Sequence, residues 1–370
     1  MSHRVIQEVA LAHSTTWFCG AYEAHVSSQL ARLLDDLPVR KGPALSAMKY
    51  ARRALYAARC EDIHWPALGL IQAAQTAQCT DCRDHVYALL GLIDQLSGME
   101  IDYTRPIHDV FEDATLQLMR RTQSLDTLVI GSLSANRQGP SWVIPFERLQ
   151  PRNTLDPSIS AAGDFDPSGG ATFWLAKTCP GQLDVLGYDV DMIEQVYAGI
   201  EDWDWSSSTD IFCDMIDRWR AAYLQHVMDT QASFASPERC HGFWKTMLWG
   251  ASKDSADARL EYESLERSID EGTLGSALAM TTISTLANSS FFFTKGGLIG
   301  LANGATSARS GDAVYVLAGC GHPMCLRTAS AAGRMFLVVA PAYVDGQWLR
   351  TKYTCRFSTD KVQVSCTERL

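Results

Sequence analysis

Hydrophobic positions in the first third of the chain recur every three to four residues, the spacing of one face of an α-helix. Residues 106–124 show it clearly, with Val110, Ala114 and Leu118 on one side and Pro106 in the first turn. The helix expected from residue 84 is preceded by Asp81, whose carboxylate is suited to cap it. The pattern predicts helices over 46–60, 64–77, 84–96 and 106–124.

From residue 132 the pattern changes, because Gly, Pro, Ser and Asn cluster there and predict a turn-rich connector. Short strands are expected at 172–176 and 183–188, and a short helix at 189–197. A longer helix is expected over 206–231, with an apolar stripe that runs from Ile211 to Val227. Shorter helices are expected at 242–250, 259–269 and 273–287.

The last quarter of the chain is rich in short apolar runs separated by Gly, Asn, Ser and Pro, which is typical of strands. A tight turn is expected at Gly311 and Asp312. The expected strands are 291–294, 298–301, 313–317, 323–327, 335–339 and 347–350. The fold class predicted is α+β, a mainly helical body with a strand-rich C-terminal antiparallel sheet or partial barrel.

Amino-acid composition and net charge disfavour some classes of binding partner and cellular location. The 370 residues include 32 Lys and Arg against 42 Asp and Glu, a net charge of −10 that disfavours nucleic acid and anionic membranes as partners. Residues 272–294 carry no charge, but their Thr, Ser, Gly and Asn content favours a buried helix and strand over a membrane span. Eleven cysteines, an odd number, and no apolar signal core predict a reducing, cytoplasmic location.

A C-x-x-C pair, Cys79 and Cys82, follows Cys60 and His64. Three thiolates and one imidazole suit tetrahedral zinc, so these four residues are a candidate metal site. The alternative is a polar turn with two small, partly buried thiols. The sequence leaves this choice open, and no cofactor is assigned.

A thiol and an imidazole lie two residues apart at Cys320 and His322, between two glycines. A nucleophilic cysteine needs its base within hydrogen-bond contact. The favoured interpretation is a turn between strands with Cys320 packed inward, because cysteine is among the most buried residue types.

Asp210, Asp214 and Asp217 share one helix face, a pattern that can bind Mg²⁺ and a diphosphate. Nearby aromatic side chains would wall a pocket; they are Trp203, Trp205, Phe212 and Trp219. The alternative is a solvated face on which Asp214 pairs with Arg218. The standard catalytic strings are absent from the sequence.

Several blocks, in order, resemble the fungal heterokaryon-incompatibility (HET) domain proteins. The clearest is CTDCRDHVYALLGL at 79–92, in which Cys82 stands where the family usually has Pro. Further matching blocks are 101–103, 109–111, 140–143, 161–163, 183–193, 243–246, 293–301, 311–317, 319–327 and 343–346. The resemblance implies that Asp81 caps a buried helix and that Arg83 and Asp84 form an ion-paired anchor.

The HET domain proper normally lies upstream, and only its last element resembles residues 4–12. The chain is therefore expected to lack most of that domain, to which cell death is ascribed. Five segments packed as one unit are expected: a HET remnant, a helical region, a turn-rich connector, a second helical region and a strand-rich region. Their bounds are 1–20, 21–131, 132–205, 206–287 and 288–370.

Two functions of different classes follow. The first is a HET-like protein without the effector core, related to fungal self/non-self recognition, with a protein partner. The second is a cofactor-independent enzyme of fungal secondary metabolism, a cyclase or isomerase acting on a small apolar molecule. Its candidate catalytic residues are Asp202, Asp204, Asp214 and His241. The oligomeric state does not follow from the sequence.

Overall fold

The computed structural model divides into two compact units. Unit 1 comprises residues 1–122 and 144–151, and unit 2 comprises residues 123–143 and 152–370. The structure describes residues 16–19, 22–25, 67–68, 71, 79–132, 139–147, 172–200, 209–230, 243, 246–248, 264, 267, 285–304, 306–329, 335–344 and 360–364. The five segments expected from the sequence stay a prediction.

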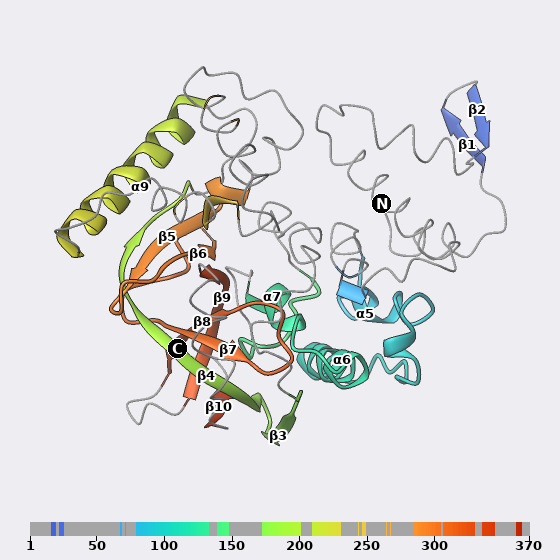
Figure 1. Ribbon diagram of the computed structural model, residues 1–370. Helices are drawn as coiled ribbons and strands as arrows, with labels where there is room; N and C mark the ends of the chain where they lie inside the picture. Colours follow the sequence, from blue (N-terminus) through green and yellow to red (C-terminus); the bar gives the residue numbers. More distant parts are fainter. Residues whose placement is uncertain are drawn as a thin grey trace. The chain divides into compact units, whose positions relative to one another are not determined.

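Unit 1 contains a small hairpin and a helical part. Strands β1 (Thr16–Cys19) and β2 (Tyr22–His25) pair antiparallel. Helix α6 (Ile107–Thr122; Figure 1) confirms the helix predicted over 106–124. Its apolar stripe is buried. Phe111 on that stripe packs against Phe146, with ring centroids 5.2 Å apart.

The helix predicted over 84–96 is wrong in length. Helix α5 spans only Asp84–Tyr87, and a single 3-10 turn, η1, follows at Asp94–Leu96. Gly91 lies between them, and Ile93 has the extended backbone angles φ −119° and ψ 102°. Between α5 and η1 most backbone bonds are of the i to i−3 type, as from the Leu89 N–H to Val86 and from the Leu92 N–H to Leu89, both at 2.9 Å, so the apolar run is buried as turns.

Unit 2 carries a mostly antiparallel sheet of eight strands and two helices whose full bounds the structure describes, besides shorter helical pieces such as residues 285–287. The helices are α7 (Thr127–Ser132) and α9 (Thr209–Thr230). The strands are β3 (Leu175–Cys179), β4 (Gln182–Tyr197), β5 (Ser289–Thr294), β6 (Ile299–Asn303), β7 (Ala313–Leu317), β8 (Met324–Thr328), β9 (Met335–Val344) and β10 (Asp360–Val364). These elements confirm the predicted long helix and six of the predicted strands, one of them as the first half of β4.

The strand pairings close into a ring, which makes the sheet a barrel. β4 pairs with β5, β5 with β6, β6 with β9, β9 with β8, β8 with β7, and β7 with β4 again. The long, curved β4 makes this possible, because residues 193–197 meet β5 while residues 182–192 meet β3, β7 and β10 (Figure 1). β10 also runs parallel to the start of β9.

The short helix predicted at 189–197 is wrong, because these residues form the second half of β4. Val190, Ile193 and Val196 are β-branched and favour an extended backbone. Partner strands β5 and β7 then supply hydrogen bonds along this segment, with bulges near Asp191 and Ile193. Pairing with strands more than 90 residues away is not visible in local periodicity.

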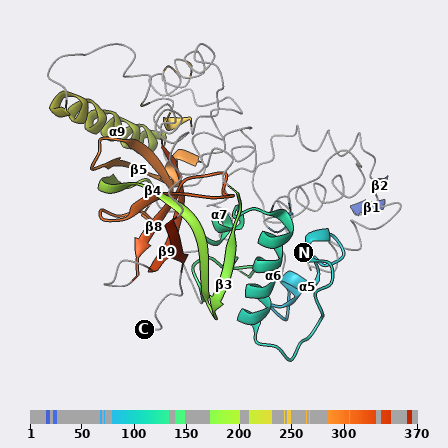
Figure 2. The same cartoon turned by 60° about the horizontal axis from the view of Figure 1, so that its bottom comes forward.

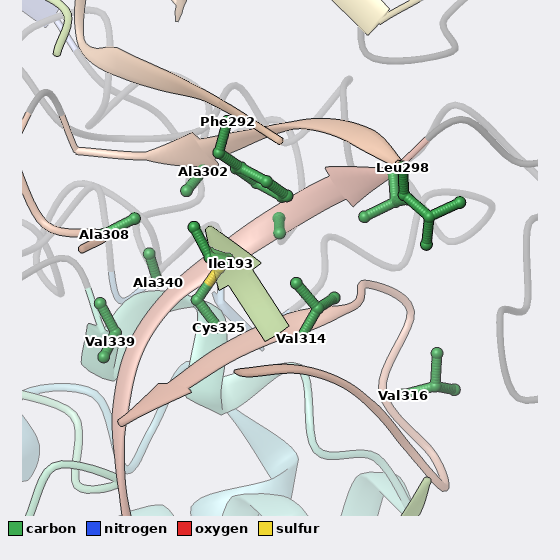
Figure 3. Packing of buried hydrophobic residues seen from close by; sticks show 12 residues of the cluster. Ile193, Phe292, Leu298, Ala302, Ala308, Val314, Val316, Cys325, Val339 and Ala340 are labelled. Atoms are coloured by element: carbon green, nitrogen blue, oxygen red, sulfur yellow. The ribbon is translucent and has the colours of Figure 1, made fainter. Parts of the chain in front are cut away.

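Small and β-branched side chains fill the barrel interior. The cluster shown in Figure 3 includes Ile193, Phe292, Ala302, Val314, Cys325 and Ala340, all buried. Phe292 is the largest of them and lies opposite Gly300 on the neighbouring strand. A Cβ on Gly300 would lie 2.5 Å from the backbone oxygen of Tyr343 and closer still to the Phe292 ring. The interior therefore holds this one ring because Gly300 leaves room for it.

The α+β class and the strand-rich sheet are confirmed, whereas a mainly helical body is not. Strands take up about as much of the described chain as helices do, and β3 and β4 join the sheet from the expected connector. The predicted helix 46–60 and strand 347–350 lie outside the described residues. In the part of the chain that the structure describes, no helix has the length and apolar character needed to cross a membrane.

Candidate functional site

The predicted catalytic residues are described only in part. Asp202, Asp204 and His241 lie outside the described residues, and Asp214 lies exposed on α9. The predicted ion pair between Asp214 and Arg218 is wrong, since Arg218 Nε donates to the backbone oxygen of Asp214 at 3.4 Å. Asp217 is the residue that pairs, with Arg220 Nη2 at 2.8 Å.

Two of the four aromatic side chains expected to wall a pocket lie in the core, and the other two, Trp203 and Trp205, lie outside the described residues. Phe212 and Trp219 are buried on the face of α9 that covers β5 (Figure 2). Trp219 stacks on Phe291 with ring centroids 5.7 Å apart, and Phe243 meets the edge of the same ring at 5.7 Å. Asp214 is five residues before Trp219, so it lies about 140° around the helix from it. The carboxylate and the aromatic rings therefore face different sides of α9.

Side-chain alternation along β5 explains this packing. Phe291 and Phe293 point toward α9, whereas Phe292 between them points into the barrel. His226 on α9 stacks on Phe293, with ring centroids 4.3 Å apart. Three consecutive phenylalanines thus join the barrel interior to its covering helix.

Cys320 and His322 lie at a turn that Asp126 holds. The backbone N–H of Gly321 donates to Asp126 Oδ1 at 2.7 Å, and the Leu125 N–H donates to the oxygen of Gly319 at 2.7 Å. Burial first, and then the Asp126 carboxylate, raise the pKa of the Cys320 thiol. Burial lowers the pKa of His322. A buried, protonated thiol suits packing rather than nucleophilic attack.

The C-x-x-C pair lies just before α5. Burial first, and then the Cys82 charge, raise the pKa of Cys79 to about 11. Cys60 and His64 lie outside the described residues, so the four-ligand zinc site stays a prediction. Within the described ranges, no three His, Cys, Asp or Glu side chains are grouped to hold a metal ion.

Arg83 ties the loop before α6 to the start of α5. Its guanidinium forms a bidentate ion pair with Asp81, in which Nε donates to Oδ1 at 2.9 Å and Nη2 donates to Oδ2 at 2.8 Å. Its Nη1 donates to the backbone oxygens of Tyr103 and Arg105, the latter at 2.8 Å. Asp81 also accepts the Arg83 N–H at 2.9 Å instead of capping α5, whose N-cap has no side-chain hydrogen bond.

Two tyrosines fix the same loop from either side. The Tyr87 hydroxyl donates to the backbone oxygen of Asp102 at 2.8 Å and accepts its N–H at 3.2 Å. The Tyr103 hydroxyl donates to Asp84 Oδ1 at 2.6 Å, and this bond is the main reason that the pKa of Tyr103 rises to about 12. The expected pair of Arg83 with Asp84 is therefore wrong, because the anchor joins Arg83 to Asp81 and Asp84 to Tyr103.

This firmly held loop nevertheless exposes apolar side chains. Ile101 is 61% exposed, Tyr103 50% and Ile107 37%. The sequence alone does not reveal this surface, because an apolar residue in a turn looks the same in sequence whether it packs inward or faces solvent. Ile107 lies three and four residues before Val110 and Phe111, so its spacing is that of the buried stripe of α6 and gives no sign that it is exposed.

No family model matches the chain, and neither does any curated protein or solved structure.

Proposed function

We propose that this chain is a HET-type binding protein of fungal self/non-self recognition, which acts by contacting a protein partner rather than by catalysis. The observation that carries the proposal is the place of Trp219 and Phe212, whose rings complete the core beneath α9. Aromatic side chains that fill a core do not line a substrate pocket. The blocks that resemble the HET family supply the fungal context.

A cyclase or isomerase is the competing function. It would need Asp202, Asp204 or His241 to act on a small apolar molecule, and these residues lie outside the described ranges. Asp214, the fourth candidate, faces away from the aromatic cluster, which favours the binding function.

Gene deletion in the fungus that carries the chain tests the proposal. We expect deletion to change the survival of fused cells in pairings between isolates, and to leave the profile of small secondary metabolites unchanged. Variants Asp204→Asn and His241→Ala are expected to behave as wild type in both measurements. Loss of a metabolite in the deletion and in these variants, with every pairing unchanged, would contradict the proposal.

A further inference from the structure

We propose that the loop formed by residues 99–107 is a docking site for a basic, amphipathic segment of a partner protein. This inference rests on the proposed binding function and names the surface that carries it. Of the seven large apolar side chains that are exposed in the described part of the chain, three fall within these nine residues. Figure 2 shows the loop between α5 and α6. We define Ile101, Tyr103 and Ile107 as the loop patch.

The loop patch is preorganised. Hydrogen bonds from Arg83, Tyr87 and Tyr103 fix its backbone and its central ring, and Asp102 Oδ1 accepts the Thr104 N–H at 2.8 Å. Arg83 also lies over the Tyr103 ring, 5.6 Å from its centroid. An exposed apolar surface costs free energy in water, and a rigid one loses little conformational entropy when a partner covers it. These are the properties of a binding surface.

The charged side chains around the loop patch indicate the chemistry of the partner segment that would bind there. Residues 79–113 contain eight carboxylates and two guanidinium groups, and each guanidinium is already paired, Arg83 with Asp81 and Arg105 with Asp113. Glu100 and Asp102 flank Ile101 directly, while Asp84 accepts the Tyr103 hydroxyl. An apolar patch bordered by carboxylates favours a segment with Leu or Ile on one side and Lys or Arg around it.

Fluorescence anisotropy with a labelled synthetic peptide tests the site on the full chain. The probe has 15 residues, with Leu every three to four positions and Lys at most others. One control peptide has Glu in place of Lys, and another has Ser in place of Leu. We expect the Leu–Lys peptide to bind at least about tenfold more tightly than either control, because both charge and apolar contact contribute.

Two double variants locate the binding. Ile101→Asn with Ile107→Asn removes apolar surface from the loop patch, and we expect it to weaken binding about tenfold. Met192→Asn with Met228→Asn is the matched control, because these side chains are equally large and exposed but belong to unit 2. We expect this control to bind as wild type does. Circular dichroism should show that both variants fold as the wild type does.

Several outcomes would overturn the site: no binding of the Leu–Lys peptide, equal binding of the Glu peptide, or loss of binding only in the Met192 and Met228 variant. Self-association of the chain that the loop variant abolishes, without peptide binding, would show that the occupant is a second copy instead. Each of these results concerns the loop patch alone and is independent of the deletion phenotype, so the two proposals fail separately.

Discussion

Asp312 is a buried carboxylate whose two oxygens are both occupied. Arg327 donates from Nε to Oδ1 at 2.8 Å and from Nη2 to Oδ2 at 2.9 Å, and the Arg309 N–H donates to Oδ2 at 2.8 Å. Arg327 Nη2 also donates to the backbone oxygen of Ser307 at 2.8 Å. One ion pair therefore fastens the loop between β6 and β7 to β8.

Replacing Arg327 is expected to be strongly destabilising. Arg327→Ala leaves the Asp312 carboxylate buried without its charge partner, and we expect unfolding free energy to fall by about 3 kcal/mol. Arg327→Lys keeps the positive charge but loses the bidentate hydrogen bonding to Asp312. Its unfolding free energy should therefore lie between those of Arg327→Ala and wild type. Chemical denaturation measures both, and a loss below about 1 kcal/mol in Arg327→Ala would contradict the account of this pair.

Asp189 gives a prediction with a defined pH dependence. Burial is the main reason that its pKa is raised, while a hydrogen bond from the Tyr315 hydroxyl at 3.5 Å opposes the shift. The folded state therefore favours the protonated form, and stability falls as pH rises through the unfolded and then the folded pKa. Because the Asp189 residue is exposed overall, solvent screens most of this effect, so Asp189→Asn should raise the unfolding free energy at pH 7 by at most about 0.5 kcal/mol, and change it little at pH 3.

Asp191 is the control for this experiment, because its carboxylate has a structural task. Its Oδ2 accepts the Gly296 N–H at 2.7 Å, and its Oδ1 accepts the Met192 N–H at 2.8 Å. Asp191→Asn removes one of these acceptors and should lower stability at pH 7. Thermal melts at pH 7 and pH 3 measure the stability of both variants. If Asp189→Asn is less stable than wild type at pH 7, burial does not dominate the environment of the Asp189 carboxyl.

Gly300 is expected to tolerate no side chain. The added Cβ of Gly300→Ala meets the backbone oxygen of Tyr343 and the ring of Phe292, so we expect a loss of about 1–3 kcal/mol. Shortening Phe292 to Leu in the same chain should recover only part of this loss, because the contact with backbone remains. An undiminished melting temperature in Gly300→Ala would contradict the packing inside the barrel.

At the scale of elements, α9 and β4 show what local pattern can predict. The apolar stripe of α9 follows helical spacing, so its extent was predicted to within three residues at each end. β4 was predicted only in its first half, since the β5 and β7 partners that stabilise the second half lie far away in sequence. The exposed loop patch was not predictable for the same reason, because exposure depends on what packs nearby.

The orientation of α9 yields a paired prediction. Trp219→Ala removes a buried ring that stacks on Phe291, and we expect it to cost about 3–5 kcal/mol. Asp214→Asn, on the exposed side, should change stability by less than about 0.5 kcal/mol. Denaturation of both variants compares the two faces directly. Equal effects would contradict the placement of the aromatic rings in the core.

At the scale of the whole molecule, residues in the blocks on which the proposed HET kinship rests form contacts that hold each unit together. Asp81, Arg83 and Tyr103 fix the loop of unit 1. In unit 2, Ser141 Oγ accepts the Val338 N–H at 3.0 Å, and Trp142 Nε1 donates to the oxygen of Gly181 at 3.0 Å. These contacts stabilise each unit separately, and the exposed loop patch of unit 1 is the surface we assign to a partner.

The measurement that bears most directly on a binding function is allele replacement in the organism that carries the chain. Ile101→Asn with Ile107→Asn should reproduce the deletion in pairings between isolates, while Asp204→Asn with His241→Ala should match wild type. The account is contradicted if the Ile101 and Ile107 variant behaves as wild type while the Asp204 and His241 variant behaves as the deletion. That outcome would favour the enzyme.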